Sequence, residues 1–235
     1  MTIAEKLLRA KADIDEVYEA GKKSQYDEFW DSYQNNGARN YYILAFGGEG
    51  WNDKTFRPKY NIAVQSDSFQ MFRSTAITDL VAALNRAGVT LDFSKATSFT
   101  QVFHSAALTR IGTIDTTNAP SVTFTQLFFN CQKLITIEKL ILSNNGTQKY
   151  SQTFQGCDAL VNLTIEGVIG QTGVSFQQSK SLSKASITSI INALSTTTSG
   201  LSITFSKTAV NNAFPDTSGW NALIGTRSNW TINLV

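Results

Sequence analysis

A short pattern of apolar and small residues recurs five times between residues 71 and 185. It runs apolar-x-x-small-x-x-apolar-x-x-apolar, and its starts are separated by 31, 26, 26 and 22 residues. A unit this short cannot bury its apolar side alone, so neighbouring units must stack and share one continuous core. The five copies are Met71–Ser74–Ile77–Leu80, Val102–Ser105–Leu108–Ile111, Phe128–Cys131–Leu134–Ile137, Phe154–Cys157–Leu160–Leu163 and Phe176–Ser179–Leu182–Ala185.

Each unit is interpreted as a turn followed by a short strand. In the fourth copy, the apolar Leu163 and Ile165 alternate with the polar Asn162 and Thr164, which predicts inward and outward faces. A second internal repeat relates residues 77–95 to residues 187–207. Each of these stretches predicts a helix that turns into a strand ending in Phe-Ser-Lys, and the two lie where capping units of an array belong.

Charge divides the chain near Tyr60. Half of the charged side chains lie in the first 60 residues, although charged residues make up only 16% of the whole chain. The predicted fold class is therefore α+β, in three parts. These are an N-terminal helical, oligomerisation or attachment segment over residues 1–37, a small β-rich aromatic linker module over 38–70, and the repeat array with its C-terminal cap over 71–235.

An amphipathic helix is predicted at the N-terminus. Its apolar residues follow a heptad spacing of 4, 3, 4 and 3 residues. This stripe either packs on its own domain or forms a short coiled coil that assembles a dimer or trimer; two heptads alone are marginal in water. The predicted oligomerisation residues are Ile3, Leu7, Ala10, Ile14 and Val17. A second helix is predicted from Tyr26, Phe29, Trp30 and Tyr33.

Residues 41–64 predict two strands around a Gly-rich turn. No Lys-Ser or Lys-Thr follows the glycines, so this turn is not a phosphate-binding loop. The aromatic residues here predict a small core that joins the helical segment to a sheet, or alternatively a sugar-stacking patch. They are Tyr41, Tyr42, Trp51 and Tyr60.

The repeats resemble the BspA-type leucine-rich repeats, whose motif runs Phe-x-x-Cys-x-x-Leu-x-x-Ile. Phe128–Ile137 and Phe154–Leu163 match this motif closely, whereas the other copies depart from it at the Phe or Cys position. The layout is similar to leucine-rich-repeat proteins encoded near tail genes of phages and prophages of gut bacteria, in which segments like Val17–Lys23 and Tyr26–Trp30 precede the array. The resemblance implies a short leucine-rich-repeat solenoid, a place in the virion, and attachment to a tail or baseplate protein through the N-terminal helix.

Composition and motifs argue against several functions. A net charge of +2 disfavours a nucleic-acid partner, and no apolar run is long enough for membrane insertion. The mixed charges of the first residues are not those of a signal peptide, so synthesis in the bacterial cytoplasm is expected. His104 is the only histidine and lacks the nucleophile and carboxylate of a catalytic triad. No enzyme, cofactor or metal site is predicted.

The two cysteines occupy equivalent positions in successive repeats. Stacking brings Cys131 and Cys157 near each other, and a buried, reduced pair is favoured over a disulfide or a metal site.

Outward strand positions of the array predict a binding face for a host-surface protein or glycan. The candidate residues are Thr109, Arg110, Gly112, Thr136, Glu138, Asn162, Thr164 and Glu166. Contacts of this kind are individually weak, so oligomerisation through the N-terminal helix would add avidity. The alternatives are a purely structural virion or baseplate spacer and, as a minor one, an enzyme that acts on cell-wall polymers.

Overall fold

The computed structural model describes residues 2–3, 25–35, 45–48, 50–64, 68–117 and 122–235. The chain divides into two compact units, Met1–Ala38 and Arg39–Val235. In the first unit, helix α2 (Gln25–Asn35) covers the second helix predicted from the sequence. Of the predicted oligomerisation residues, only Ile3 is described, and its side chain is 79% exposed; the other four lie outside the described residues.

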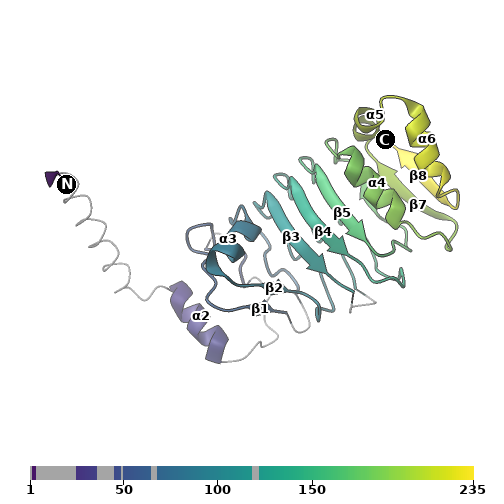
Figure 1. Cartoon of the computed structure of the whole chain (residues 1–235). Helices are drawn as coiled ribbons and strands as arrows, with labels where there is room; N and C mark the ends of the chain where they lie inside the picture. The colour runs from purple at the N-terminus through teal and green to yellow at the C-terminus, as the bar shows by residue number, and fades with distance from the viewer. Residues whose placement is uncertain (1, 4–24, 36–44, 49, 65–67, 118–121) are drawn as a thin grey trace. The chain divides into compact units, whose positions relative to one another are not determined.

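The second unit consists of short strands and helices joined by stacked turns (Figure 1). In chain order its elements are β1 (Ile62–Ala63), α3 (Leu80–Ala87), β2 (Leu91–Asp92), β3 (Arg110–Asp115), β4 (Thr136–Ile141), β5 (Asn162–Glu166), β6 (Ser175–Phe176), α4 (Lys184–Ala193), β7 (Leu201–Phe205), α5 (Lys207–Ala213), α6 (Thr217–Gly225) and β8 (Trp230–Leu234). Residues 38–70, predicted as a separate module, fall almost entirely within this unit.

The prediction of a leucine-rich-repeat solenoid is wrong. Within the described residues there are five helices, and the strands form three separate small parallel sheets, β1–β2, β3–β4–β5 and β6–β7–β8, with no closed solenoid. Helices lie beside both edge strands of the middle sheet, α3 against β3 and α4 against β5, which are the positions that further strands would occupy (Figure 1). The sheet is therefore limited to three strands.

Stacked aromatic rings form the core of the second unit. Successive rings of the main aromatic column lie 4.5–5.7 Å apart, and their planes differ by no more than 27°. This spacing is within the range at which aromatic pairs attract each other beyond their burial. The column consists of Phe72, Phe103, Phe128, Phe154, Phe176 and Phe205. A shorter second column consists of Phe99, Phe124 and Tyr150; Tyr150 stacks on Phe124, and Phe99 is tilted by 46° against Phe124.

The column corrects the register of the first two repeats. Phe72 and Phe103 stack with the later phenylalanines, whereas the pattern had placed Met71 and Val102 in that position. All four side chains are fully buried, so burial alone does not distinguish them. The tripeptide Gln-x-Phe recurs at residues 70–72, 101–103, 126–128 and 152–154, and this signal would have given the correct register.

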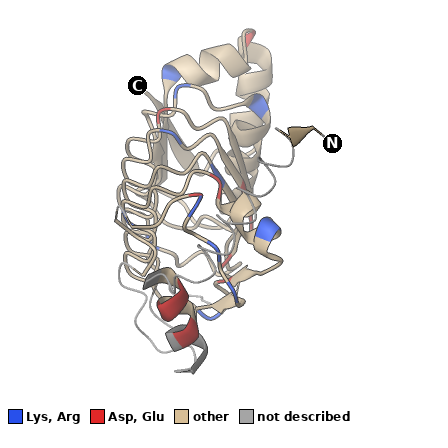
Figure 2. Cartoon of the chain, turned by 90° about the vertical axis from the view of Figure 1, so that its left-hand side faces the viewer, with Lys and Arg blue, Asp and Glu red and all other residues tan. Residues whose placement is uncertain are grey.

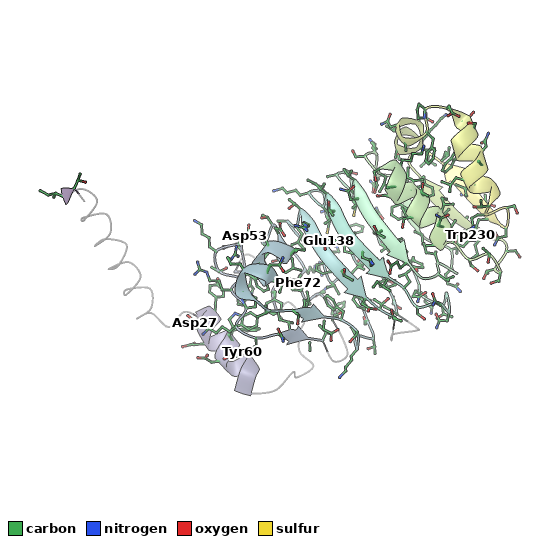
Figure 3. All side chains as sticks on the ribbon, viewed as in Figure 1. Asp27, Asp53, Tyr60, Phe72, Glu138 and Trp230 are labelled. Atoms are coloured by element: carbon green, nitrogen blue, oxygen red, sulfur yellow. The ribbon has the colours of Figure 1, made fainter. Side chains whose placement is uncertain are left out.

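The aromatic linker residues contribute to the core as well. Trp51 is 7% exposed and meets Phe46 and Phe56 edge-on, at ring-centroid distances of 5.6 and 5.7 Å. Phe46 and Phe56 in turn contact Phe72, the first ring of the main column, which Figure 3 labels. Trp51 is therefore part of a core, whereas the predicted junction of this core with the helical segment stays a prediction. Tyr41 and Tyr42 lie outside the described residues.

Candidate functional site

The outer face of the β3–β4–β5 sheet carries most of the residues predicted to bind a ligand. In β5, Leu163 and Ile165 are buried, while Asn162, Thr164 and Glu166 are exposed, as the alternation predicted. Arg110, Thr136 and Asn162 are aligned across the three strands by the parallel register. We call the outward-facing side chains of these three strands the sheet face.

Two ion pairs and one hydrogen bond connect neighbouring strands on the sheet face. Arg110 pairs with Glu138, which Figure 3 labels, and both side chains remain partly exposed. Lys139 pairs with Glu166 at 2.5 Å, and Nδ2 of Asn162 donates to the Thr136 hydroxyl at 3.2 Å. Exposed ion pairs contribute little to stability, so their charges are available to a partner at small cost.

A bulge between β4 and β5 explains why the sequence analysis missed Lys139. The pairing shifts between Ile137 and Leu140, so that two consecutive residues of β4, Glu138 and Lys139, lie on the outward side. Strict alternation would place Lys139 inside the core. The adjacent polar residues between two apolar ones were the available signal of a bulge.

Two of the predicted ligand-binding residues have structural partners that limit their access. The Thr109 hydroxyl donates to the backbone carbonyl of Thr78 at 2.9 Å, and the Thr109 amide donates to the same carbonyl. Gly112 lies under α3, because a Cβ at this position would be 3.3 Å from Cγ2 of Val81. The remaining six predicted residues lie on the sheet face and are exposed or half-buried.

Hollows border the sheet face on both sides. A hollow of about 280 Å³ lies between α3 and β3, and Val81, Leu84, Thr113 and Glu138 are among its lining residues. On the other side, an open hollow of about 610 Å³ is lined mainly by α4, including Thr188 and Asn192. The sheet face is thus a polar strip between two depressions, a shape that suits a macromolecular partner more than a small molecule.

The two cysteines are buried and form no disulfide with each other. The Cys131 thiol donates to the carbonyl of Phe103 at 2.8 Å, and the Cys157 thiol donates to that of Phe128 at 3.1 Å. Burial raises the pKa of Cys131 to about 12, and it raises the pKa of Cys157 as well. Both thiols are therefore protonated at neutral pH, and the predicted burial of the two cysteines is confirmed.

His104 lies at the surface of a stacked turn. Its Nδ1 is 3.0 Å from the Ser105 hydroxyl, and its ring stacks on Phe129 at 4.8 Å. Burial and the nearby Arg73 charge lower the pKa of His104, so its imidazole is neutral at pH 7. Among its hydrogen-bond and ring partners there is no carboxylate to orient it for catalysis.

No group of three or more potential metal ligands occurs among the described residues. None of the helices in the described ranges combines the length and apolar character that crossing a bilayer requires. Comparisons of the chain with protein-family models, with curated proteins and with solved structures give no match. The resemblance to BspA-type repeats thus rests on the quoted motif residues alone.

Proposed function

We propose that this chain is a non-enzymatic binding protein that recognises a protein or glycan on a host-cell surface through the sheet face. The supporting observation is the set of exposed charges, amides and hydroxyls that three paired strands hold in fixed positions. Buried residues of the same strands, such as Ile111, Ile137 and Leu163, anchor each of these positions from below. A rigid arrangement loses little conformational entropy when it binds.

The charge pattern favours a polar partner of mixed character. Arg110 and Lys139 alternate with Glu138 and Glu166, so the sheet face has no dominant sign. Thr136, Asn162 and Thr164 lie among these charges and offer neutral hydrogen-bonding groups. A partner that carries both donors and acceptors, such as a surface protein loop or a branched glycan, matches such a face.

Attachment and avidity belong to the same proposal. The N-terminal stripe of Ile3, Leu7, Ala10, Ile14 and Val17 would gather two or three copies and dock them on a phage tail or baseplate protein. Linking several weak sites in this way raises apparent affinity by about 10²–10⁴ where the geometry allows simultaneous contact. Light scattering of the full chain and of a chain lacking residues 1–20 tests the assembly: a multimer that becomes a monomer supports it, and two monomers contradict it.

Cell binding tests the recognition role of the sheet face. We expect the labelled protein to bind cells of a susceptible gut bacterium and the double variant Thr136→Arg/Thr164→Arg to lose this binding, because two bulky charges block the middle of the sheet face. The matched control is Thr231→Arg, an exposed threonine of β8, which should bind like the unaltered chain. Circular dichroism confirms that all variants fold.

The outcome also separates recognition from a spacer role. Unchanged binding by the folded double variant, or binding by no version of the chain, would favour a purely structural virion component. Treating the cells with periodate or with a protease before the assay distinguishes a glycan partner from a protein partner.

A further inference from the structure

Four glutamines form a hydrogen-bonded column along the stacked turns. Gln70 donates through Nε2 to Oε1 of Gln101 at 2.6 Å, Gln101 donates to Gln126 at 2.5 Å, and Gln126 donates to Gln152 at 2.7 Å. All four residues have a positive φ, between 53° and 59°, a conformation that non-glycine residues rarely adopt. We call this column the amide ladder.

All hydrogen bonds of the amide ladder run in the same direction along the chain, and the last amide, that of Gln152, has N–H donors that the ladder does not use. Each amide donates toward the next higher residue number, so Gln152 accepts a bond through Oε1 but passes none on. Within the part of the chain that the structure describes, Nε2 of Gln152 makes no hydrogen bond to another residue. Two N–H donors of this amide are therefore available to a ligand.

A hollow of about 260 Å³ begins where the amide ladder ends. Four glutamine side chains line it, together with Phe154, Gly173 and Ser175, and no charged residue is among the lining residues. The four are Gln152, Gln155, Gln177 and Gln178. Oε1 of Gln178 accepts a bond from the Gly156 amide at 2.6 Å, which fixes the orientation of this side chain. We call this hollow the amide pocket.

The lining of the amide pocket indicates the chemistry of its ligand. Each primary amide offers two donors and one acceptor oxygen, which matches the paired donor and acceptor character of adjacent sugar hydroxyls. A site for a phosphate or carboxylate would be expected to hold Arg, Lys or a helix N-terminus, and the amide pocket has none of these. Its volume is below the 300–1,000 Å³ typical of drug-sized ligands, so a single ring fits best.

The neighbouring surface extends the same character. In Figure 2, most of the ribbon of the stacked turns is tan, the colour of uncharged residues. His104 and Phe129 lie three residues after Gln101 and Gln126 in the sequence, and their half-buried rings stack on each other.

We propose that the amide pocket binds one neutral sugar residue of a glycan. This site is separate from the sheet face, because none of its lining residues belongs to β3, β4 or β5. A failed test of the amide pocket would therefore leave the proposed recognition through the sheet face untouched, and the reverse also holds. If both sites bind, one molecule would contact two parts of a cell-surface glycan.

The test is a titration of the full, ¹⁵N-labelled chain with glucose, galactose and N-acetylglucosamine, followed through the side-chain NH₂ resonances of glutamine. We expect shifts at Gln152 and Gln177 for at least one of these sugars, with a dissociation constant in the millimolar range that is typical of few hydrogen bonds. Glucuronic acid, the acidic relative of glucose, is expected to bind less tightly than the neutral sugars.

Two pocket variants and one matched control decide the assignment. Gln152→Ala and Gln177→Ala should each weaken binding by about tenfold, because each removes a direct donor. Gln70→Ala removes a glutamine of the same backbone conformation from the opposite end of the amide ladder, and it should leave binding unchanged. Absence of any shift with all three neutral sugars, equal binding by the pocket variants, or preference for glucuronic acid would each overturn the proposal.

Discussion

The hydroxyl of Ser186 takes the place of a neighbouring strand for the backbone of Leu163. Oγ of Ser186 accepts a hydrogen bond from the Leu163 amide at 2.8 Å and donates one to the carbonyl of Val161 at 2.9 Å. One turn later in α4, Ser189 makes the same pair of bonds to the amide and carbonyl of Ile165. The serine side chains of α4 thus make the hydrogen bonds that a further strand would make with the backbone of β5. This protects the edge of the sheet from pairing with a strand of another chain.

Replacing Ser186 by alanine should destabilise the second unit. Ser186 is 3% exposed, so the variant leaves the Leu163 amide buried without a partner, at an expected cost of about 1–3 kcal/mol. Chemical denaturation measures this difference. Thr188→Ala is the matched control, because Thr188 is half-buried in the same helix and makes no hydrogen bond through its side chain to another described residue. Equal losses in the two variants would show that the edge bonds do not matter.

Replacing Tyr150 by phenylalanine should stabilise the protein. The Tyr150 hydroxyl is buried at the end of the second aromatic column and has no hydrogen-bond partner among the described residues. Removing an unsatisfied buried hydroxyl while keeping the ring should raise the free energy of unfolding by about 1 kcal/mol. Thermal and urea denaturation check the direction. A lower stability would reveal a hydrogen bond made by this hydroxyl, for example to a buried water molecule.

Because His104 is the single histidine of the chain, its pKa can be measured directly. Because burial and Arg73 lower the pKa of His104, its NMR titration midpoint should lie below the ordinary value of 6.5. Arg73→Gln should move the midpoint upward by removing the charge. A midpoint at or above 6.5 in the unaltered chain would contradict the structure around this turn.

The same shift determines how His104 affects stability. The unfolded chain takes up the proton first as the pH falls, so the contribution of His104 to stability is complete above pH 6.5. It is lost as the pH falls from there through the lowered pKa of the folded state. Urea denaturation at several pH values between about 7 and 5 should show the free energy of unfolding falling with pH. In a His104→Gln variant the free energy of unfolding should fall less over the same range.

The thiols should be protected from modification in the folded protein. Burial raises the pKa of Cys131 to about 12, and only the thiolate reacts with aromatic disulfide reagents. We expect neither Cys131 nor Cys157 to react within minutes at pH 8, and both to react at once in guanidinium chloride. Fast reaction of one thiol in the native state would show that its turn opens readily.

Several elements could be predicted because the sequence patterns that indicate them are local. The alternation of Asn162, Leu163, Thr164 and Ile165 predicts which side chains of β5 face outward, and burial agrees. The helical pattern that begins at Ile187 overlaps α4, which starts three residues earlier and ends at Ala193. Such patterns depend on neighbours a few residues away, and these are fixed by the sequence itself.

The remaining features depend on contacts between repeats. Each of the first two repeats has two adjacent buried apolar residues, and only one of them joins the aromatic column. Phe72 and not Met71 takes this position because its ring stacks on Phe103 of the next repeat. The bulge at Glu138 and the side-chain edge bonds of Ser186 likewise arise when strands of unequal repeat length, or a helix and a strand, must pair. For the same reason the predicted solenoid is wrong, because helices beside β3 and β5 limit the sheet between them.

The main aromatic column also determines where the molecule can grow. At one end Phe46 lies at 31° to Phe72, and Trp51 and Phe56 in turn meet Phe46 edge-on, at 75° and 76°. At the other end Trp220 meets Phe205 at 85°, so edge-on rings cover both ends of the column. Internal units such as that of Phe128 instead have a nearly parallel ring on both sides. Duplication of an internal unit would therefore extend the column by one more stacked ring. A unit added beyond either end would meet an edge-on ring and could not continue the stack.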